Sequence, residues 1–216
     1  MVPSSSLTRN LLTEDENGYI EASDCKTNED EILNVILNWM NSKKNLPPKS
    51  AVSILKNINC DNMLDVGCGL GRILKIIQKN KPDVQISAID ISQVILDKLP
   101  SNINSKVGSL LKIPFDNEQF DFVMTTEALE HAIDIENAIK ELARVVAKKG
   151  KFLIIDKNIK AKGAFATPPW EQWFDTESLK HMIEQQGFTV DVYENLPHNG
   201  KDGSDGIYVA WVGTKQ

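Results

Sequence analysis

The chain has 216 residues, of which 41% are hydrophobic and 25% charged, a composition that supports a sizeable core and argues against global disorder. Its formal net charge of -6 argues against a nucleic-acid partner, because such proteins usually carry a basic surface. No stretch approaches the roughly 20 apolar residues of a membrane span, and the first residues lack the pattern of a signal peptide. We therefore expect a cytoplasmic protein without a membrane partner.

Residues 1–59 are predicted to form a leader and a helical cap. The first 28 residues are polar with little periodicity, which predicts a partly ordered leader. Apolar residues then recur at helical spacing from Ile32 to Met40, and a second helix is predicted over residues 50–58. We place the boundary after residue 59, with residues 60–216 as the main domain.

Short apolar segments alternate with amphipathic ones from residue 60 onward, which predicts an α/β fold with a mostly parallel sheet covered on both faces. Strands are expected at 62–66, 84–90, 105–107, 120–125 and 151–156, and helices at 71–80, 92–99 and 135–147.

The helix at 135–147 is expected to close with Lys148-Lys149-Gly150, because positive charge and glycine are typical of helix ends. Asp175 or Thr176 is expected to cap a helix over 177–186. Strands at 188–194 and 206–213 flank a turn rich in Gly, Asp and Asn, which predicts an antiparallel hairpin at the carboxyl terminus.

A glycine loop follows the first strand of the main domain. The strand ends in Asp65-Val66 and breaks into Gly67-Cys68-Gly69-Leu70-Gly71. Glycine lets the backbone approach a ligand closely, and the next helix begins with its amide groups facing that ligand. Cys68 is either a nucleophile or, as we favour, a small side chain between glycines. The three cysteines of the chain show no disulfide or metal-ligand spacing, so no metal site is expected.

The spacing of the glycines separates two classes of nucleotide cofactor. A dinucleotide fingerprint needs a third glycine where this chain has Arg72, so the loop disfavours NAD. The next strand ends in Asp90-Ile91, and a carboxylate there can accept hydrogen bonds from both hydroxyls of a ribose. A helix cap is the structural alternative for Asp90.

The motifs LDVGCGLGR, AIDIS, GSLLKIPFDNEQFDFVMTTEALEHA and KFLIID resemble those of the class I, Rossmann-like, S-adenosylmethionine-dependent methyltransferases of small molecules. The resemblance implies a seven-stranded sheet whose last strand is antiparallel, with S-adenosylmethionine as cofactor over Gly67 to Gly71. It implies Asp90 on the ribose, Ile91 beside adenine, Ser109 and Leu110 near the adenine edge, and Glu127 at the methionine end. Relatives often have Asp where this chain has Ser109, so Ser109 either contacts adenine or only starts a turn.

His131 is the candidate general base, because it follows the fourth strand of the main domain and imidazole accepts protons near neutral pH. Its alternative is to order the loop. Glu130 either orients the imidazole or begins a helix. The basic segment after the fifth strand, from Lys157, is either a solvated loop or a site for an acidic acceptor group. We expect Trp170 to line an acceptor pocket, Trp173 to lie in the core, and Tyr19 and Trp39 to form a lid.

The function predicted from these residues is methyl transfer to an oxygen or nitrogen nucleophile of a small-molecule acceptor. Methyl transfer from a sulfonium needs mainly alignment of the two reactants. Two other hypotheses are a non-catalytic cofactor-binding scaffold and an NAD-dependent oxidoreductase. Production of S-adenosylhomocysteine distinguishes the enzyme from the scaffold, and a binding titration distinguishes the two cofactors.

Overall fold

The computed structural model of the protein describes residues 12–14, 20–22, 60–161, 169–196 and 207–216. The chain divides into two compact units, Met1–Asn45 and Leu46–Gln216. In the first unit, β1 (Leu12–Glu14) and β2 (Ile20–Ala22) pair antiparallel, a pairing not predicted from this polar segment. The helices expected before residue 60, and with them Trp39, lie outside the described residues, as does Tyr19.

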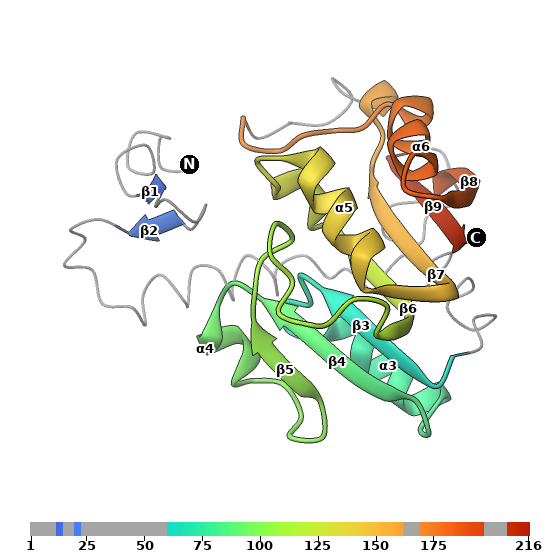
Figure 1. The fold of residues 1–216 in the computed structure, drawn as a ribbon. Helices are drawn as coiled ribbons and strands as arrows, with labels where there is room; N and C mark the ends of the chain where they lie inside the picture. The colour runs from blue at the N-terminus through green and yellow to red at the C-terminus, as the bar shows by residue number, and fades with distance from the viewer. Residues whose placement is uncertain (1–11, 15–19, 23–59, 162–168, 197–206) are drawn as a thin grey trace. The chain divides into compact units, whose positions relative to one another are not determined.

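The second unit has the predicted alternation of strands and helices (Figure 1). Its strands are β3 (Asn62–Val66), β4 (Gln85–Asp90), β5 (Asn104–Val107), β6 (Phe120–Thr126), β7 (Val146–Lys157), β8 (Phe188–Leu196) and β9 (Tyr208–Lys215). Its helices are α3 (Arg72–Asn80), α4 (Gln93–Leu96), α5 (Ile135–Val145) and α6 (Thr176–Glu184), with the short 3₁₀ helices η1 (Leu129–His131) and η2 (Ile159–Ala161).

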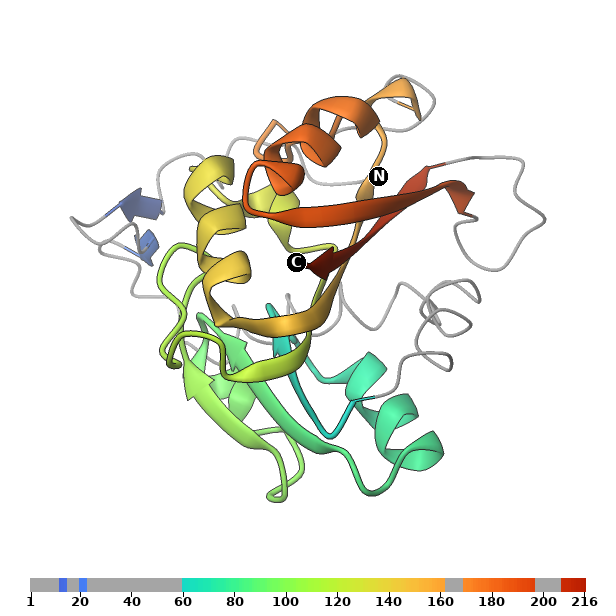
Figure 2. The ribbon, with the colours of Figure 1, turned by 45° about the vertical axis from the view of Figure 1, so that its right-hand side comes forward.

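In the described part of the second unit these strands form one sheet of seven, in the order β5-β4-β3-β6-β7-β9-β8. Strand β3 pairs parallel with both β4 and β6, so the strand order reverses direction between β3 and β6. Strand β9 runs antiparallel to both β7 and β8, and Figure 2 shows this carboxyl-terminal pair in orange-red and dark red. The mostly parallel fold and the antiparallel hairpin are therefore confirmed. In such sheets a ligand binds at the carboxyl ends of the strands beside the reversal.

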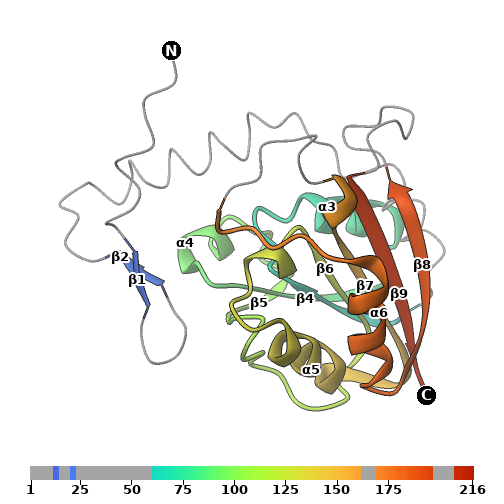
Figure 3. The same ribbon diagram turned by 90° about the horizontal axis from the view of Figure 1, so that it is seen from above.

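Both faces of the sheet are buried, because successive strand residues point to opposite sides. Leu64 and Ile154 belong to the core that packs α5 and α6, whereas Met63 and Leu153 belong to the core that packs α3. Seen from above, α3 lies on one side of the strands and α5 with α6 on the other (Figure 3). No helix among the residues described is long and apolar enough to cross a membrane.

Two helix predictions need correction. Helix α4 has four residues and ends at Leu96, three residues before the expected end. Helix α5 ends at Val145, so Lys148-Lys149-Gly150 lies inside β7 and not at a helix end. There the pairing register between β6 and β7 shifts, with Phe120 opposite Val146 but Phe122 opposite Lys151. Residues that local sequence signals assign to a helix end therefore lie within the strand that pairs with β6.

Candidate functional site

The predicted site residues follow the carboxyl ends of adjacent strands. The glycine loop follows β3, Asp90 ends β4, and Ser109 follows β5. Glu127 follows β6, and Lys157 ends β7. Because parallel strands present these ends at one edge of the sheet, the named residues come together at the strand reversal although they are far apart in the sequence.

All three glycines of the loop adopt left-handed backbone angles, with φ of 77° at Gly67, 50° at Gly69 and 65° at Gly71. L residues avoid this region, so the repeated glycines have a conformational reason. A Cβ at Gly67 would lie 2.6 Å from the Cβ of Ala128, in the segment that follows β6. The loop therefore packs closely against the neighbouring strand connection as it turns into α3.

Asp90 holds the glycine loop in place. Its Oδ2 accepts a hydrogen bond from the backbone N–H of Gly69 at 3.0 Å, and its Oδ1 accepts one from Ser92 N–H at 3.0 Å. The helix-cap alternative is not what the structure shows, because Ser92 is the N-cap residue of α4 and Asp90 only accepts from its N–H. A carboxylate can accept about four hydrogen bonds, so positions remain for a ribose diol.

Asp65 is a buried acid beneath this loop. It is 2% exposed, and its Oδ1 has no hydrogen-bond partner among the described residues. Burial and then the charge of Asp90 raise the pKa of Asp65 to about 8. The same influences, with burial the largest, raise the pKa of Cys68 above its ordinary value. A thiol that stays protonated is a poor nucleophile, which supports the interpretation of Cys68 as a small side chain.

The segment expected at the adenine edge is a turn fastened to α5. Ser109 Oγ accepts a hydrogen bond from Leu111 N–H at 3.1 Å, so Ser109 does start a turn, whether or not it also contacts a ligand. Leu110 packs partly buried against the core. Ile91, which follows β4, is 64% exposed and offers an apolar surface that a flat ring could cover.

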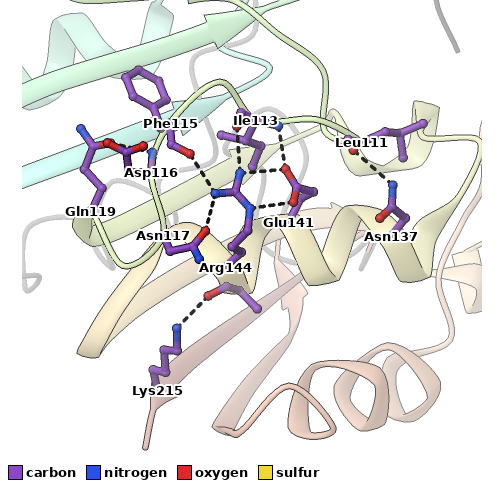
Figure 4. A network of polar contacts seen from close by, with 11 residues as sticks. Leu111, Ile113, Phe115, Asp116, Asn117, Gln119, Asn137, Glu141, Arg144 and Lys215 are labelled. Atoms are coloured by element: carbon purple, nitrogen blue, oxygen red, sulfur yellow. Dashed lines mark hydrogen bonds and ion pairs between the residues drawn. The ribbon is translucent and has the colours of Figure 1, made fainter. Parts of the chain in front are cut away.

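Arg144 of α5 fastens this segment, as Figure 4 shows. Its guanidinium donates to the carbonyl oxygens of Ile113 and Phe115, both at 2.8 Å. Glu141 accepts from Arg144 Nε at 2.7 Å and from Ile113 N–H at 2.8 Å. The Glu141–Arg144 pair of α5 thus supplies hydrogen-bond partners for three backbone groups of the connection between β5 and β6.

Glu127 has a left-handed backbone angle, with φ of 51°, and its N–H donates to Ile155 O at 2.9 Å. Its Oε2 accepts a hydrogen bond at 2.9 Å from the hydroxyl of Tyr208, which begins β9. Burial, followed by the charge of Glu127, raises the pKa of Tyr208, so this hydroxyl stays a donor. The carboxylate predicted at the methionine end is thereby oriented from the hairpin.

Lys157 lies in a buried ion cluster. Its Nζ is 2.7 Å from Glu130 Oε2 and 2.7 Å from Glu171 Oε2, with the three side chains 7%, 3% and 5% exposed. The solvated-loop interpretation is therefore wrong for Lys157. Glu130 does not begin a helix of the α5 type; it lies in η1, and its N–H donates to Asp156 Oδ2 at 3.1 Å.

His131 is the exposed member beside this cluster, with 45% of its side chain accessible and its Nε2 3.5 Å from Glu130 Oε1. Ligand atoms of Glu130, His131 and Glu171 lie within 4.8 Å of one another, a spacing that could hold a metal ion. The ammonium of Lys157 already lies 2.7 Å from an oxygen of each carboxylate and would repel a second cation, so this cluster does not fit a metal site.

The aromatic segment divides as expected in one respect. Trp173 is 7% exposed and belongs to the core, whereas Trp170 is 65% exposed. Gln172 ties the segment to η1, because its N–H donates to Glu130 O at 2.9 Å and its amide donates to Ala132 O at 2.7 Å. Trp170 lies two residues before Gln172 and so belongs to a segment that is hydrogen-bonded to η1 and to Ala132. Its place in an acceptor pocket stays a prediction.

Sequence reasoning missed three residues of this edge: Asp156, Glu171 and Tyr208. Asp156 ends the motif KFLIID as a charged residue in an apolar strand, and this was an available signal. Burial and the charge of Glu130 raise the pKa of Asp156 well above its ordinary value. Glu171 and Tyr208 join the site from distant segments, and no local pattern marks them.

Residues 64–154 match a family model described as a methyltransferase domain. Ajmaline N-methyltransferase of Rauvolfia serpentina is 36% identical over 103 residues, which are 44% of this chain and 35% of that relative. Tocopherol O-methyltransferase of Arabidopsis thaliana is 30% identical over 146 residues, which are 62% of this chain and 41% of that relative. The chain spans less than half the length of these two curated relatives.

Among solved structures, a SAM-dependent methyltransferase of Thermotoga maritima matches with a TM-score of 0.67 at 18% identity. The match covers 87% of this chain and 97% of that chain. At this identity the similarity concerns the fold, and it extends beyond the residues that the family model matches.

Proposed function

Because this chain belongs to the class I S-adenosylmethionine-dependent methyltransferases, we propose that it moves a methyl group to an oxygen or nitrogen nucleophile of a small molecule. The observation that carries this proposal is the pairing of β3 with β6, which brings the ends of the two strands side by side. The glycine loop follows one of these strands, and the connection carrying His131 follows the other. The donor and acceptor sites are thereby neighbours.

The residues at this edge fit the cofactor. A Cβ at Gly67 would lie 2.6 Å from the Cβ of Ala128, so this position has no room for a side chain and its backbone stays uncovered by one. Asp90 keeps acceptor positions for ribose hydroxyls, and exposed Ile91 offers an apolar surface for adenine. Asp65 Oδ1, buried and without a partner among the described residues, and Glu127 supply carboxyl groups toward a cationic amino acid end.

S-adenosylmethionine supplies an electrophilic methyl group when bound, so the chain has to align the acceptor and remove its proton. His131 is suited to the second task, because its imidazole is 45% exposed and lies 3.5 Å from the Glu130 carboxylate. A carboxylate at that distance favours the imidazolium that forms after proton transfer. Trp170, with Tyr19 and Trp39, is proposed to contact the acceptor, and an N or O acceptor is in keeping with the two named relatives.

The proposal is tested by turnover. The chain is incubated with S-adenosylmethionine and a panel of small phenols, alcohols and amines, and S-adenosylhomocysteine is quantified. We expect at least one acceptor to be methylated. Tight binding of S-adenosylhomocysteine with no turnover across the panel would favour the scaffold hypothesis instead.

Replacement of His131 by alanine tests the base. We expect kcat to fall by about 10² or more, because general-base catalysis contributes on that order, while the affinity for S-adenosylhomocysteine in calorimetry is kept. His181→Ala, which removes an exposed imidazole of α6, is the matched control and should leave the rate unchanged. A normal rate in His131→Ala would refute the assignment of His131 as the base.

A further inference from the structure

The buried ion cluster next to His131 has a use beyond stability. Lys157 donates hydrogen bonds to Glu130 Oε1 at 2.8 Å and to Glu171 Oε2 at 2.7 Å. Glu171 Oε2 also accepts from the indole N–H of Trp173 at 3.2 Å. Both carboxylates are therefore fixed in direction by buried donors.

The same two carboxylates face the imidazole of His131, because one ligand atom from each of Glu130, His131 and Glu171 lies within 4.8 Å of the others. Lys157 is the buried partner of the carboxylates, with 7% of its side chain exposed, and His131 is the exposed partner, with 45%. The ammonium and the imidazole are thus linked through a pair of acids.

The two acids depend on the ammonium for their arrangement. Burial, the largest influence, leaves the pKa of Glu130 raised overall, although the hydrogen bond and charge of Lys157 lower it. Two facing carboxylates repel, so without a cation between them they move apart or take up a proton in its place. What Lys157 gives the imidazole is therefore not a change of net charge but two acids held in place beside the ring.

We propose that Lys157 is a positioning residue for His131, holding the carboxyl groups of Glu130 and Glu171 against the imidazole so that the ring is oriented. Only the use made of His131 rests on the proposed function; the coupling between Lys157 and the ring does not require it.

Other titratable groups border the cluster. Asp156 accepts hydrogen bonds from the N–H groups of Lys157 and Glu130, and burial raises its pKa. Glu127 accepts from Tyr208, and its charge contributes to the raised pKa of Glu130. These groups are common to every variant below, so differences between variants report on Lys157, Glu130 and Glu171.

The test is an NMR titration of the histidine ring protons and nitrogens in the full chain. The chain has three histidines, and the His131 resonance is the one lost in His131→Gln. In Lys157→Met we expect the nitrogen shifts to show a loss of the tautomer protonated on Nε2, because Glu130 is no longer held 3.5 Å from that nitrogen. Glu130→Gln should weaken the same tautomer, and adding Lys157→Met to Glu130→Gln should produce no further change.

Lys160→Met is the matched control. Lys160 is 67% exposed and pairs with Glu194 at the surface, so its loss should leave the His131 tautomer unchanged. An unchanged tautomer in Lys157→Met would overturn the proposal. An equal change in the Glu130→Gln background would overturn it too, because Lys157 would then act on the ring without Glu130.

Glu171→Gln covers the case in which Lys157→Met does not fold, because Lys157 keeps Glu130 as its partner there. We expect the pKa of His131 to fall, since one of two facing carboxylates is removed, and an unchanged value contradicts the proposal. The titration is independent of turnover. A normal rate in His131→Ala would defeat the proposed base and leave the coupling intact, whereas an uncoupled ring with a slow His131→Ala would do the reverse.

Discussion

A single buried acid illustrates what the site does to its residues. Asp65 is 2% exposed, and burial with the charge of Asp90 raises its pKa to about 8. The folded state therefore binds the Asp65 proton more tightly than the unfolded chain, in which the pKa of this carboxyl lies near its ordinary value of 3.8. This contribution to stability is fully present below about pH 4 and is lost as the pH rises toward 8.

Asp65→Asn tests that linkage, because the amide has the same shape and no charge. Relative to the variant, the wild-type free energy of unfolding should fall by more than about 1.4 kcal/mol between pH 4 and pH 9, the equivalent of one pK unit. Urea denaturation at both pH values measures the difference. Asp97→Asn, at an exposed acid after α4, should show no such change, and a pH-independent difference for Asp65→Asn would contradict the raised pKa.

The connection between β5 and β6 is an element whose order comes from its neighbour. Its Ile113 and Phe115 carbonyls accept from Arg144, its Ile113 N–H donates to Glu141, and its Leu111 carbonyl accepts from Asn137 (Figure 4). Helix α5 thereby supports the turn that carries Ser109 and Leu110. A change on α5 can reach the predicted adenine edge without touching it.

Arg144→Met removes this support. We expect a loss of about 1–3 kcal/mol in the free energy of unfolding, because two carbonyls and Glu141 lose a charged partner. We also expect weaker S-adenosylhomocysteine binding in calorimetry. Lys140→Met is the control on the same helix, since Lys140 is 58% exposed and its ion pair with Glu136 is long at 4.0 Å. Unchanged affinity in a destabilised Arg144→Met would show that the turn does not serve the cofactor.

At the scale of the whole molecule, the second unit has the core it needs. The two buried clusters of the described residues run from Met63 to Trp211 and cover both faces of the sheet. A fragment of residues 46–216 should therefore unfold cooperatively, with a midpoint within about 5 °C of the full chain, as a change of 1 kcal/mol moves it by roughly 2–4 °C. Thermal unfolding followed by circular dichroism measures this.

The same fragment tests the proposed lid, which includes Tyr19 and Trp39. If these side chains cover the cofactor or acceptor, the fragment binds S-adenosylhomocysteine more weakly or loses turnover while its midpoint is kept. Full affinity and full turnover of the fragment would contradict the proposed lid. An unfolded fragment would contradict the independence of the second unit.

Most of the sheet could be predicted because its signals are local. Strand β3 has the predicted bounds, and β4, β5 and β6 differ from theirs by one residue. The ends of α5 and β7 could not be predicted, because Lys148-Lys149-Gly150 has a helix-end composition, whereas the pairing of Val146 and Lys151 with β6 on either side places it within β7. Elements whose bounds depend on neighbouring residues can be predicted from the sequence, and elements whose bounds depend on pairing with a distant segment cannot.

The sequence by itself determined the glycine loop and the acid near it, because Gly67, Gly69 and Gly71 adopt left-handed angles that glycine favours, and Asp90 ends β4, the strand that follows the loop and α3. Only the tertiary structure decided the surroundings of His131. Glu130, Lys157 and Glu171 come from three segments, and the contacts of the Lys157 ammonium with both carboxyl groups give them their directions. Such coupling depends on distance in space, which spacing along the chain does not express.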